Sequence, residues 1–96
     1  MIIIQWVEIK YMNIYIKGID KYISGFNEII IIQKMCDLQW ISNNKINYRK
    51  DVVRRCYVLY GYRIKNATPK MFIESLANYQ LIEIKKENEG KENDGT

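Results

Sequence analysis

Basic residues are concentrated in one part of this 96-residue chain, between positions 45 and 70. The segment carries a formal charge of +7 and the remainder −3. A concentrated run of cations is what contacts with a polyanion require. The alternative is a solvated helix face on which Lys and Arg stems cover core residues, and charge alone does not separate the two. The basic residues are Lys45, Arg49, Lys50, Arg54, Arg55, Arg63, Lys65 and Lys70, and the one acid is Asp51.

Catalytic chemistry has little support in the residue types. The chain has no histidine, which removes the imidazole base of Ser-His and Cys-His pairs and the commonest metal ligand. The acidic residues are scattered, and no Gly-rich phosphate loop occurs. We therefore expect no enzyme activity, metal or cofactor, although the sequence does not exclude a lone Cys or Lys nucleophile. Cys36 and Cys56 do not form a Cys-x-x-Cys pair, and we interpret them as buried free thiols, with one bridge between them as the alternative.

The composition predicts a single domain over residues 1–86. Apolar residues make up 48% of the chain, which suits the dense core that a short chain needs. Residues 87–96 are polar and mildly acidic, and we expect a disordered tail. The longest aliphatic run, residues 29–32, is far below the ~20 residues that span a bilayer. No secretory signal is visible, so we expect a cytoplasmic protein without membrane contact.

The N-terminal third changes its apolar pattern at Gly18. Residues 2–16 are rich in β-branched and aromatic types, which favours one or two strands, with a short helix as the alternative. The following apolar residues have the spacing of an amphipathic helix, with Asp20 near its N-terminus. We expect this helix to continue to about residue 41, with Trp40 at its end. Its apolar residues are Ile19, Tyr22, Ile23, Phe26, Ile29 and Ile30.

Two further helices are predicted in the second half of the chain. One covers residues 48–62 and ends near Gly61, which can adopt the left-handed conformation that closes a helix. The other covers residues 69–78 and begins at Thr68-Pro69, a cap followed by a proline at the first helical position. The alternation of residues 81–86 predicts a strand. The apolar faces are Val52, Val53, Cys56, Leu59 and Tyr60 in the first helix, and Phe72, Ile73, Leu76 and Tyr79 in the second.

Tyrosine is frequent, with eight in the chain and several between residues 48 and 62. Tyrosine rings beside cations can stack on the bases of a single strand. At helical spacing they more often pack at the core with the hydroxyl at the surface. We expect Tyr57 and Tyr60 to lie in the core.

Residues 48–86 resemble the second half of a winged-helix domain, of the kind found in small basic DNA-binding proteins of archaea and their viruses. The similar pattern is Thr/Ser-x-x-x-Phe/Val-x-x-x-Leu followed by Leu-Ile-Glu, carried here by Thr68, Phe72, Leu76 and residues 81–83. The family usually has glycine where this chain has Gln80, so Gln80 must adopt the helix-ending turn at some cost. The resemblance implies an α+β, mainly α, winged-helix-like domain of three helices with short N-terminal and C-terminal strands.

The resemblance also implies the DNA-binding residues. The helix at 69–78 would be the recognition helix in the major groove, and the preceding helix would cross the backbone. Lys85 and Lys86 would lie near phosphate at the end of the wing strand. Thr68 and Pro69 are equally explained as a plain helix cap. The implied set is Arg49, Lys50, Arg54, Arg55, Lys65, Asn66, Thr68, Lys70, Lys85 and Lys86, with Met71 near the base edges.

Two functions fit these patterns. The first is a winged-helix transcription regulator that binds double-stranded DNA or another nucleic acid, as a homodimer. The second is a protein-interaction module or an accessory subunit of a nucleic-acid-processing complex, without catalytic activity. The basic residues favour the first, and the surplus of apolar residues at positions 2–32 favours the second as a contact surface. The two functions are compatible, because the N-terminal half can form a dimer contact while the C-terminal half binds nucleic acid.

Overall fold

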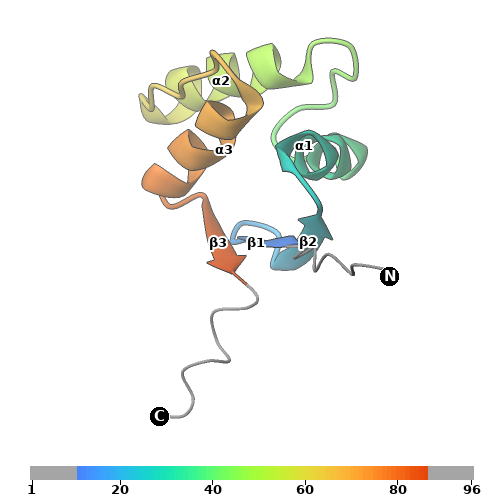
Figure 1. Ribbon diagram of the computed structural model, residues 1–96. Helices are drawn as coiled ribbons and strands as arrows, with labels where there is room; N and C mark the ends of the chain where they lie inside the picture. The colour runs from blue at the N-terminus through green and yellow to red at the C-terminus, as the bar shows by residue number, and fades with distance from the viewer. Residues whose placement is uncertain (1–10, 87–96) are drawn as a thin grey trace, which may run out of the picture.

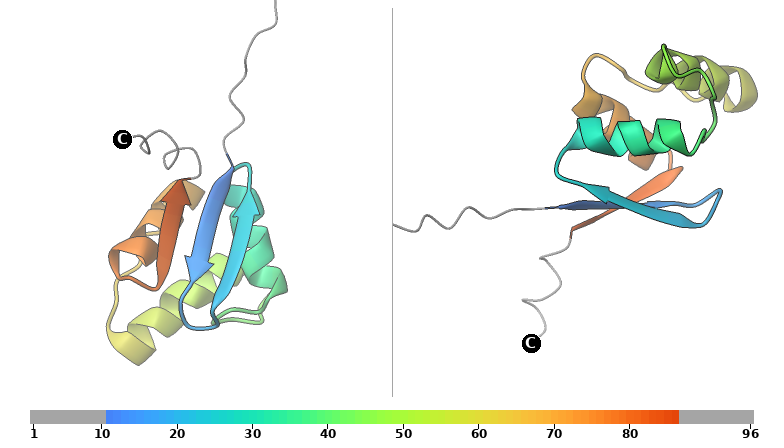
Figure 2. Two further views of the ribbon diagram at one scale, coloured as in Figure 1. Left: turned by 90° about the horizontal axis from the view of Figure 1, so that it is seen from below. Right: turned by 90° about the vertical axis from the view of Figure 1, so that its right-hand side faces the viewer.

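All three helices lie on one side of a three-stranded sheet in the computed structural model, which describes residues 11–86 (Figures 1 and 2). The chain is therefore a small α+β domain, as predicted. The predicted tail, residues 87–96, and the first ten residues lie outside the described part. None of the described helices is long and apolar enough to cross a lipid bilayer. The elements, in order, are β1 (Met12–Ile16), β2 (Lys21–Gly25), α1 (Glu28–Asp37), α2 (Tyr48–Tyr60), α3 (Pro69–Asn78) and β3 (Ile82–Lys86).

The sheet joins the two ends of the described chain. Its order is β2-β1-β3 and both pairings are antiparallel. Ile14 and Ile16 of β1 and Ile82 of β3 turn inward and are almost fully buried, which is the alternation expected of a sheet covered on one face. Strands were predicted in both regions. The pairing of the C-terminal strand with β1 is a long-range contact, and no local sequence pattern indicates it.

The predicted first helix is wrong in its N-terminal half, because residues 21–25 form β2. Asp20 has a left-handed φ of 54°, and its Oδ1 accepts a hydrogen bond from the Tyr15 hydroxyl at 2.6 Å, which fixes the hairpin turn. Tyr22 then lies beside Tyr15 across the strands, with ring centroids 4.7 Å apart. Gly25 is required by packing, since a Cβ there would lie 2.7 Å from Cγ2 of Ile30.

Helix α1 begins later and ends earlier than predicted. Its N-cap is Asn27, whose Oδ1 accepts from the Ile30 N–H at 3.0 Å. It ends at Asp37, and Trp40 follows as a buried residue of the loop rather than as the end of the helix. Residues 21–25 pair with β1 instead, so a helical spacing over a few residues does not decide the local structure when tertiary pairing competes with it.

Helices α2 and α3 begin where they were predicted to begin. The Thr68 hydroxyl accepts from the Met71 N–H at 3.1 Å with Pro69 following, and α3 ends at Asn78. Gly61 ends α2 with φ 77°. Gln80 has φ 64°, the left-handed turn expected at the position where the family has glycine.

The core lies between the sheet and the helices. Its largest fully buried side chains come from every layer: Ile14, Ile16, Ile31, Met35, Val52, Cys56, Phe72, Ile73, Leu76 and Ile82. Cys36 and Cys56 are both buried and free, as predicted. Helix α2 lies at the end of the domain away from the sheet (Figure 1). Its buried residues, Tyr48, Val52 and Cys56, all precede its last turn.

Candidate nucleic-acid interface

The excess positive charge of the described residues lies entirely in the basic segment, as we call residues 45–70. Outside this segment the described residues contain five basic and five acidic side chains, which cancel. Inside it there are eight basic side chains and one acid. The basic segment comprises the end of the loop before α2, α2 itself, the connector (residues 61–68) and the first residues of α3. The net attraction of this domain for a polyanion therefore originates there.

The one acid of the basic segment holds two of the arginines. Asp51 Oδ1 accepts from Nη2 of Arg54, and Oδ2 accepts from Nε of Arg55, both at 2.8 Å. The Ser42 hydroxyl donates to the same carboxylate at 2.5 Å. These bonds, led by that of Ser42, hold the pKa of Asp51 well below its usual range. Arg54 and Arg55 are thus partly neutralised, whereas no acid in the described part of the chain pairs with Lys50, Lys65 or Lys70.

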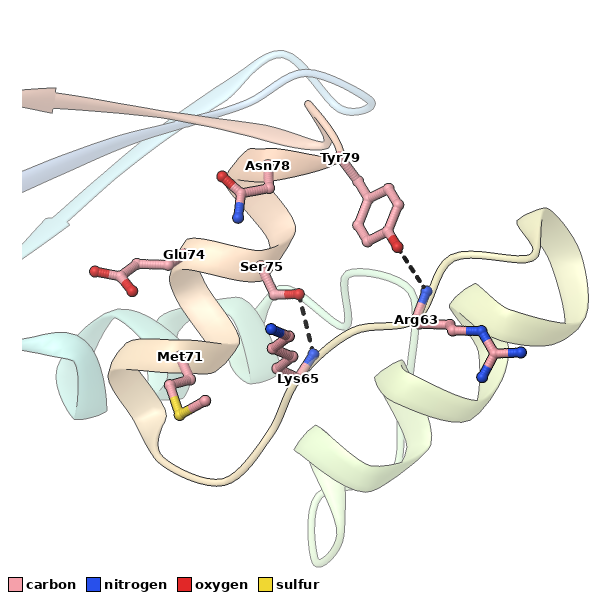
Figure 3. Close-up of a pocket in the computed structure, with 7 residues that line it drawn as sticks. All are labelled: Arg63, Lys65, Met71, Glu74, Ser75, Asn78 and Tyr79. Carbon is pink, nitrogen blue, oxygen red and sulfur yellow. Dashed lines mark hydrogen bonds between the residues drawn. The ribbon is translucent and has the colours of Figure 1, made fainter.

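A hollow of about 290 Å³ opens between the connector and α3; we call it the α3 hollow (Figure 3). Its walls are joined by two hydrogen bonds. The Lys65 N–H donates to Oγ of buried Ser75 at 3.0 Å, and the Arg63 N–H donates to the Tyr79 hydroxyl at 3.1 Å. The lining residues are Arg63, Lys65, Met71, Glu74, Ser75, Asn78 and Tyr79.

The α3 hollow combines hydrogen-bonding groups of both kinds with apolar surface. The side chains of Lys65, Glu74 and Asn78 make no ion pair or hydrogen bond to any other described residue. Met71 and the Tyr79 ring supply the apolar part. The guanidinium of Arg63 extends away from Tyr79 toward α2 (Figure 3), where it lies 5.4 Å from the ring centroid of Tyr57.

A second hollow, of about 270 Å³, lies at the start of α2. Nη1 of Arg49 and Oδ1 of Asn66 are both buried there, and neither has a hydrogen-bond partner among the described residues. The N-cap residue, Asn47, makes no side-chain capping bond, so the first amides of α2 also lack this partner. The lining residues are Ile46, Asn47, Tyr48, Arg49, Lys50 and Asn66.

The residues implied by the winged-helix resemblance divide into two groups. Arg49, Lys50 and Asn66 meet at the second hollow, while Lys65 and Met71 line the α3 hollow. The Thr68 hydroxyl is engaged as a helix cap, and Lys70 is exposed in the first turn of α3. Lys85 lies in β3 and pairs with Glu83 at 3.1 Å. Lys85 and Lys86 therefore lie in the sheet, at the opposite end of the domain from α2 (Figure 1).

Three expectations about α2 are wrong. Tyr57, Leu59 and Tyr60 were expected at the core, but they are 52%, 64% and 54% exposed. The reason is that α2 extends beyond the layer it covers, so residues with the right spacing have nothing to pack against. The Tyr60 ring instead lies tilted beside the Tyr62 ring, with centroids 5.1 Å apart, and the Tyr62 ring stacks on the Tyr79 ring with centroids 4.4 Å apart.

Sequence reasoning missed several residues of the α3 hollow, namely Glu74, Ser75, Asn78 and Tyr79. The signal available was the helical spacing of Met71, Glu74 and Asn78, which places them on one outward stripe of α3. Only the path of the connector converts that stripe into the wall of a hollow. The described residues contain no cluster of three or more potential metal ligands. No family model matches this chain, and comparisons with curated proteins and with solved structures likewise found no match.

Proposed function

We propose that this protein binds nucleic acid, with the basic segment contacting phosphates. The observation that carries the proposal is that the net charge of the described residues resides wholly in residues 45–70. Lys50, Lys65 and Lys70 are exposed and have no acidic partner in the described domain. Exposed, unpaired cations on neighbouring elements supply the sequence-independent part of binding to a phosphate backbone.

The finer form of the proposal is a winged-helix transcription regulator that binds duplex DNA. It is supported by the succession of α2, a capped α3 and a strand, and by the left-handed Gln80. Two features differ from that arrangement. The connector has eight residues, longer than the short turn of a helix-turn-helix, and β3 pairs with β1 rather than with a following strand in the described chain. Phosphate binding by the basic segment does not depend on either feature.

The test compares two pairs of lysines in a binding assay with a labelled 12-mer, both as duplex and as single strand. Replacing Lys50 and Lys65 together by Ala should weaken binding to every sequence about equally, because phosphate contacts carry no sequence information. Replacing Lys17 and Lys21, which lie at the hairpin, removes the same charge and should have a much smaller effect. Equal losses from the two pairs would mean that the basic segment is not the binding surface.

A second candidate function, a protein-interaction module, is favoured by the exposed end of α2. Val58 and Leu59 are 68% and 64% exposed, beside Tyr57 and Tyr60. Consecutive exposed apolar residues are typical of contact surfaces. A homodimer would form through this surface or through the N-terminal third, where Ile29 is 65% exposed. Light scattering at high micromolar concentration tests it. A wild-type monomer would exclude self-association, and a dimer that persists in the L59S variant would exclude self-association through α2.

A further inference from the structure

The polar groups of the α3 hollow suit a ligand that both donates and accepts hydrogen bonds. Lys65 offers donors, Glu74 offers acceptors and Asn78 offers both. None of these three side chains is bonded to another described residue. Met71 and Tyr79 offer apolar surface beside them. The volume of about 290 Å³ lies just below the usual range of ligand pockets, which suits a small planar group.

We propose that the α3 hollow receives one unpaired nucleobase that carries an exocyclic amino group, from a strand whose phosphates lie on the basic segment. The inference rests on the proposed function and specifies its ligand. The base edge would donate its amino hydrogen to Glu74 and accept from the Asn78 amide. The ring would lie against Met71 and Tyr79, as bases do on aromatic and apolar side chains in single-strand recognition.

The charge of Glu74 favours a base over a phosphate group as the ligand of the α3 hollow. A carboxylate repels a phosphate group placed beside it, and Glu74 has no cationic partner in the described structure that would cancel this charge. A ligand that donates to Glu74 removes the conflict. Adenine and cytosine present an amino group (N6 and N4) at the position where thymine presents its O4 carbonyl oxygen. The hollow should therefore disfavour thymine.

The shape of the hollow favours an unpaired base over a base pair in a groove. The Lys65–Ser75 and Arg63–Tyr79 hydrogen bonds hold the connector beside α3. Met71, Glu74 and Asn78 consequently line one side of a hollow whose other side is formed by the connector, rather than an isolated helix surface. A groove-reading helix must protrude between the strands of a duplex. A base that has left its stack can enter a recess.

The experiment measures the affinities of single-stranded dC12 and dT12, and of an abasic strand of equal length, at one salt concentration. Wild type should bind dC12 about tenfold more tightly than dT12 or the abasic strand, the range of one good base contact. E74Q should bring dC12 and dT12 close together, because the Gln amide can also donate to the thymine carbonyl. D37N is the control, since it changes net charge equally in α1 and should raise all affinities alike while preserving the ratio. Thermal melting should show both variants folded, because Glu74 and Asp37 are exposed.

Each other outcome has a definite meaning. Equal binding of dC12, dT12 and the abasic strand would overturn the base assignment and leave phosphate binding intact. A change in duplex sequence preference in E74Q, without a change on single strands, would show that α3 reads a groove instead. Displacement of dC12 by micromolar cytidine monophosphate would identify a free-nucleotide site and overturn the strand assignment. No binding of any oligonucleotide would refute the proposed function together with this inference.

Discussion

The Lys65 N–H donates to the Oγ of Ser75 at 3.0 Å, and this bond fixes the connector against α3. Ser75 is only 6% exposed, so its hydroxyl lies inside the wall of the α3 hollow. The bond satisfies a backbone donor in a segment that has no regular secondary structure. It therefore determines both where the connector runs and how the hollow is shaped.

Replacing Ser75 by Ala should lower the free energy of unfolding by about 1–2 kcal/mol, because the Lys65 N–H loses its acceptor. Discrimination between dC12 and dT12 should fall in the same variant, since the wall of the hollow is released. Denaturant unfolding measures the first effect. The S24A substitution is the control, because the Ser24 hydroxyl makes no hydrogen bond to a described residue, and its stability should be close to wild type. A fully stable S75A protein would mean that water replaces the hydroxyl.

Acid should destabilise the protein through Asp51. The folded pKa of Asp51 lies below its unfolded value because Ser42, Arg55 and Arg54 hydrogen-bond to the carboxylate. This contribution is fully present above about pH 4, the ordinary aspartate pKa, and is lost as the pH falls below it. Denaturant unfolding between neutral pH and pH 3 should show this loss in wild type and a smaller one in D51N, which should also be less stable at pH 7. Parallel pH profiles would contradict the assignment.

Replacing Gln80 by glycine should make the folded protein more stable. Its φ of 64° is left-handed, which costs a non-glycine residue about 1 kcal/mol or more. Part of the gain is offset by the greater entropy of glycine in the unfolded chain, so Q80G should stabilise by about 0.5 kcal/mol. The melting temperature measures it. Q33G, in the interior of α1, is the matched control and should destabilise by about 1 kcal/mol. Loss of stability in Q80G would indicate that the Gln80 side chain has a packing role.

The elements that could be predicted are those with a local cause. Thr68 and Pro69 set the start of α3, and Gly61 ends α2, each through the conformation of one or two residues. The β1–β2 hairpin was missed because it depends on a turn at Asp20 and on pairing with β1. The exposure of Tyr57 could not be predicted, since it depends on where the neighbouring layer ends.

The basic residues of the candidate site could be predicted from the sequence, but the hollow that they adjoin could not. The concentration of cations in residues 45–70 is visible in the sequence. The α3 hollow is not, because it requires the connector to bond to Ser75 and Tyr79, ten and sixteen residues away from their partners. Lys85 and Lys86 were grouped with the other cations by analogy with a wing, and the pairing of β3 with β1 carries them to the sheet.

The most direct test of nucleic-acid binding is the affinity of the wild-type protein for a 12-mer single strand as a function of salt. If the basic segment neutralises phosphates, log K should fall linearly with log salt, with a slope of about −0.7 per contact. Three contacts, from Lys50, Lys65 and Lys70, would give a slope of about −2 on that basis. A slope near this value supports the account. An affinity that does not change with salt, or no measurable binding at low salt, would contradict it.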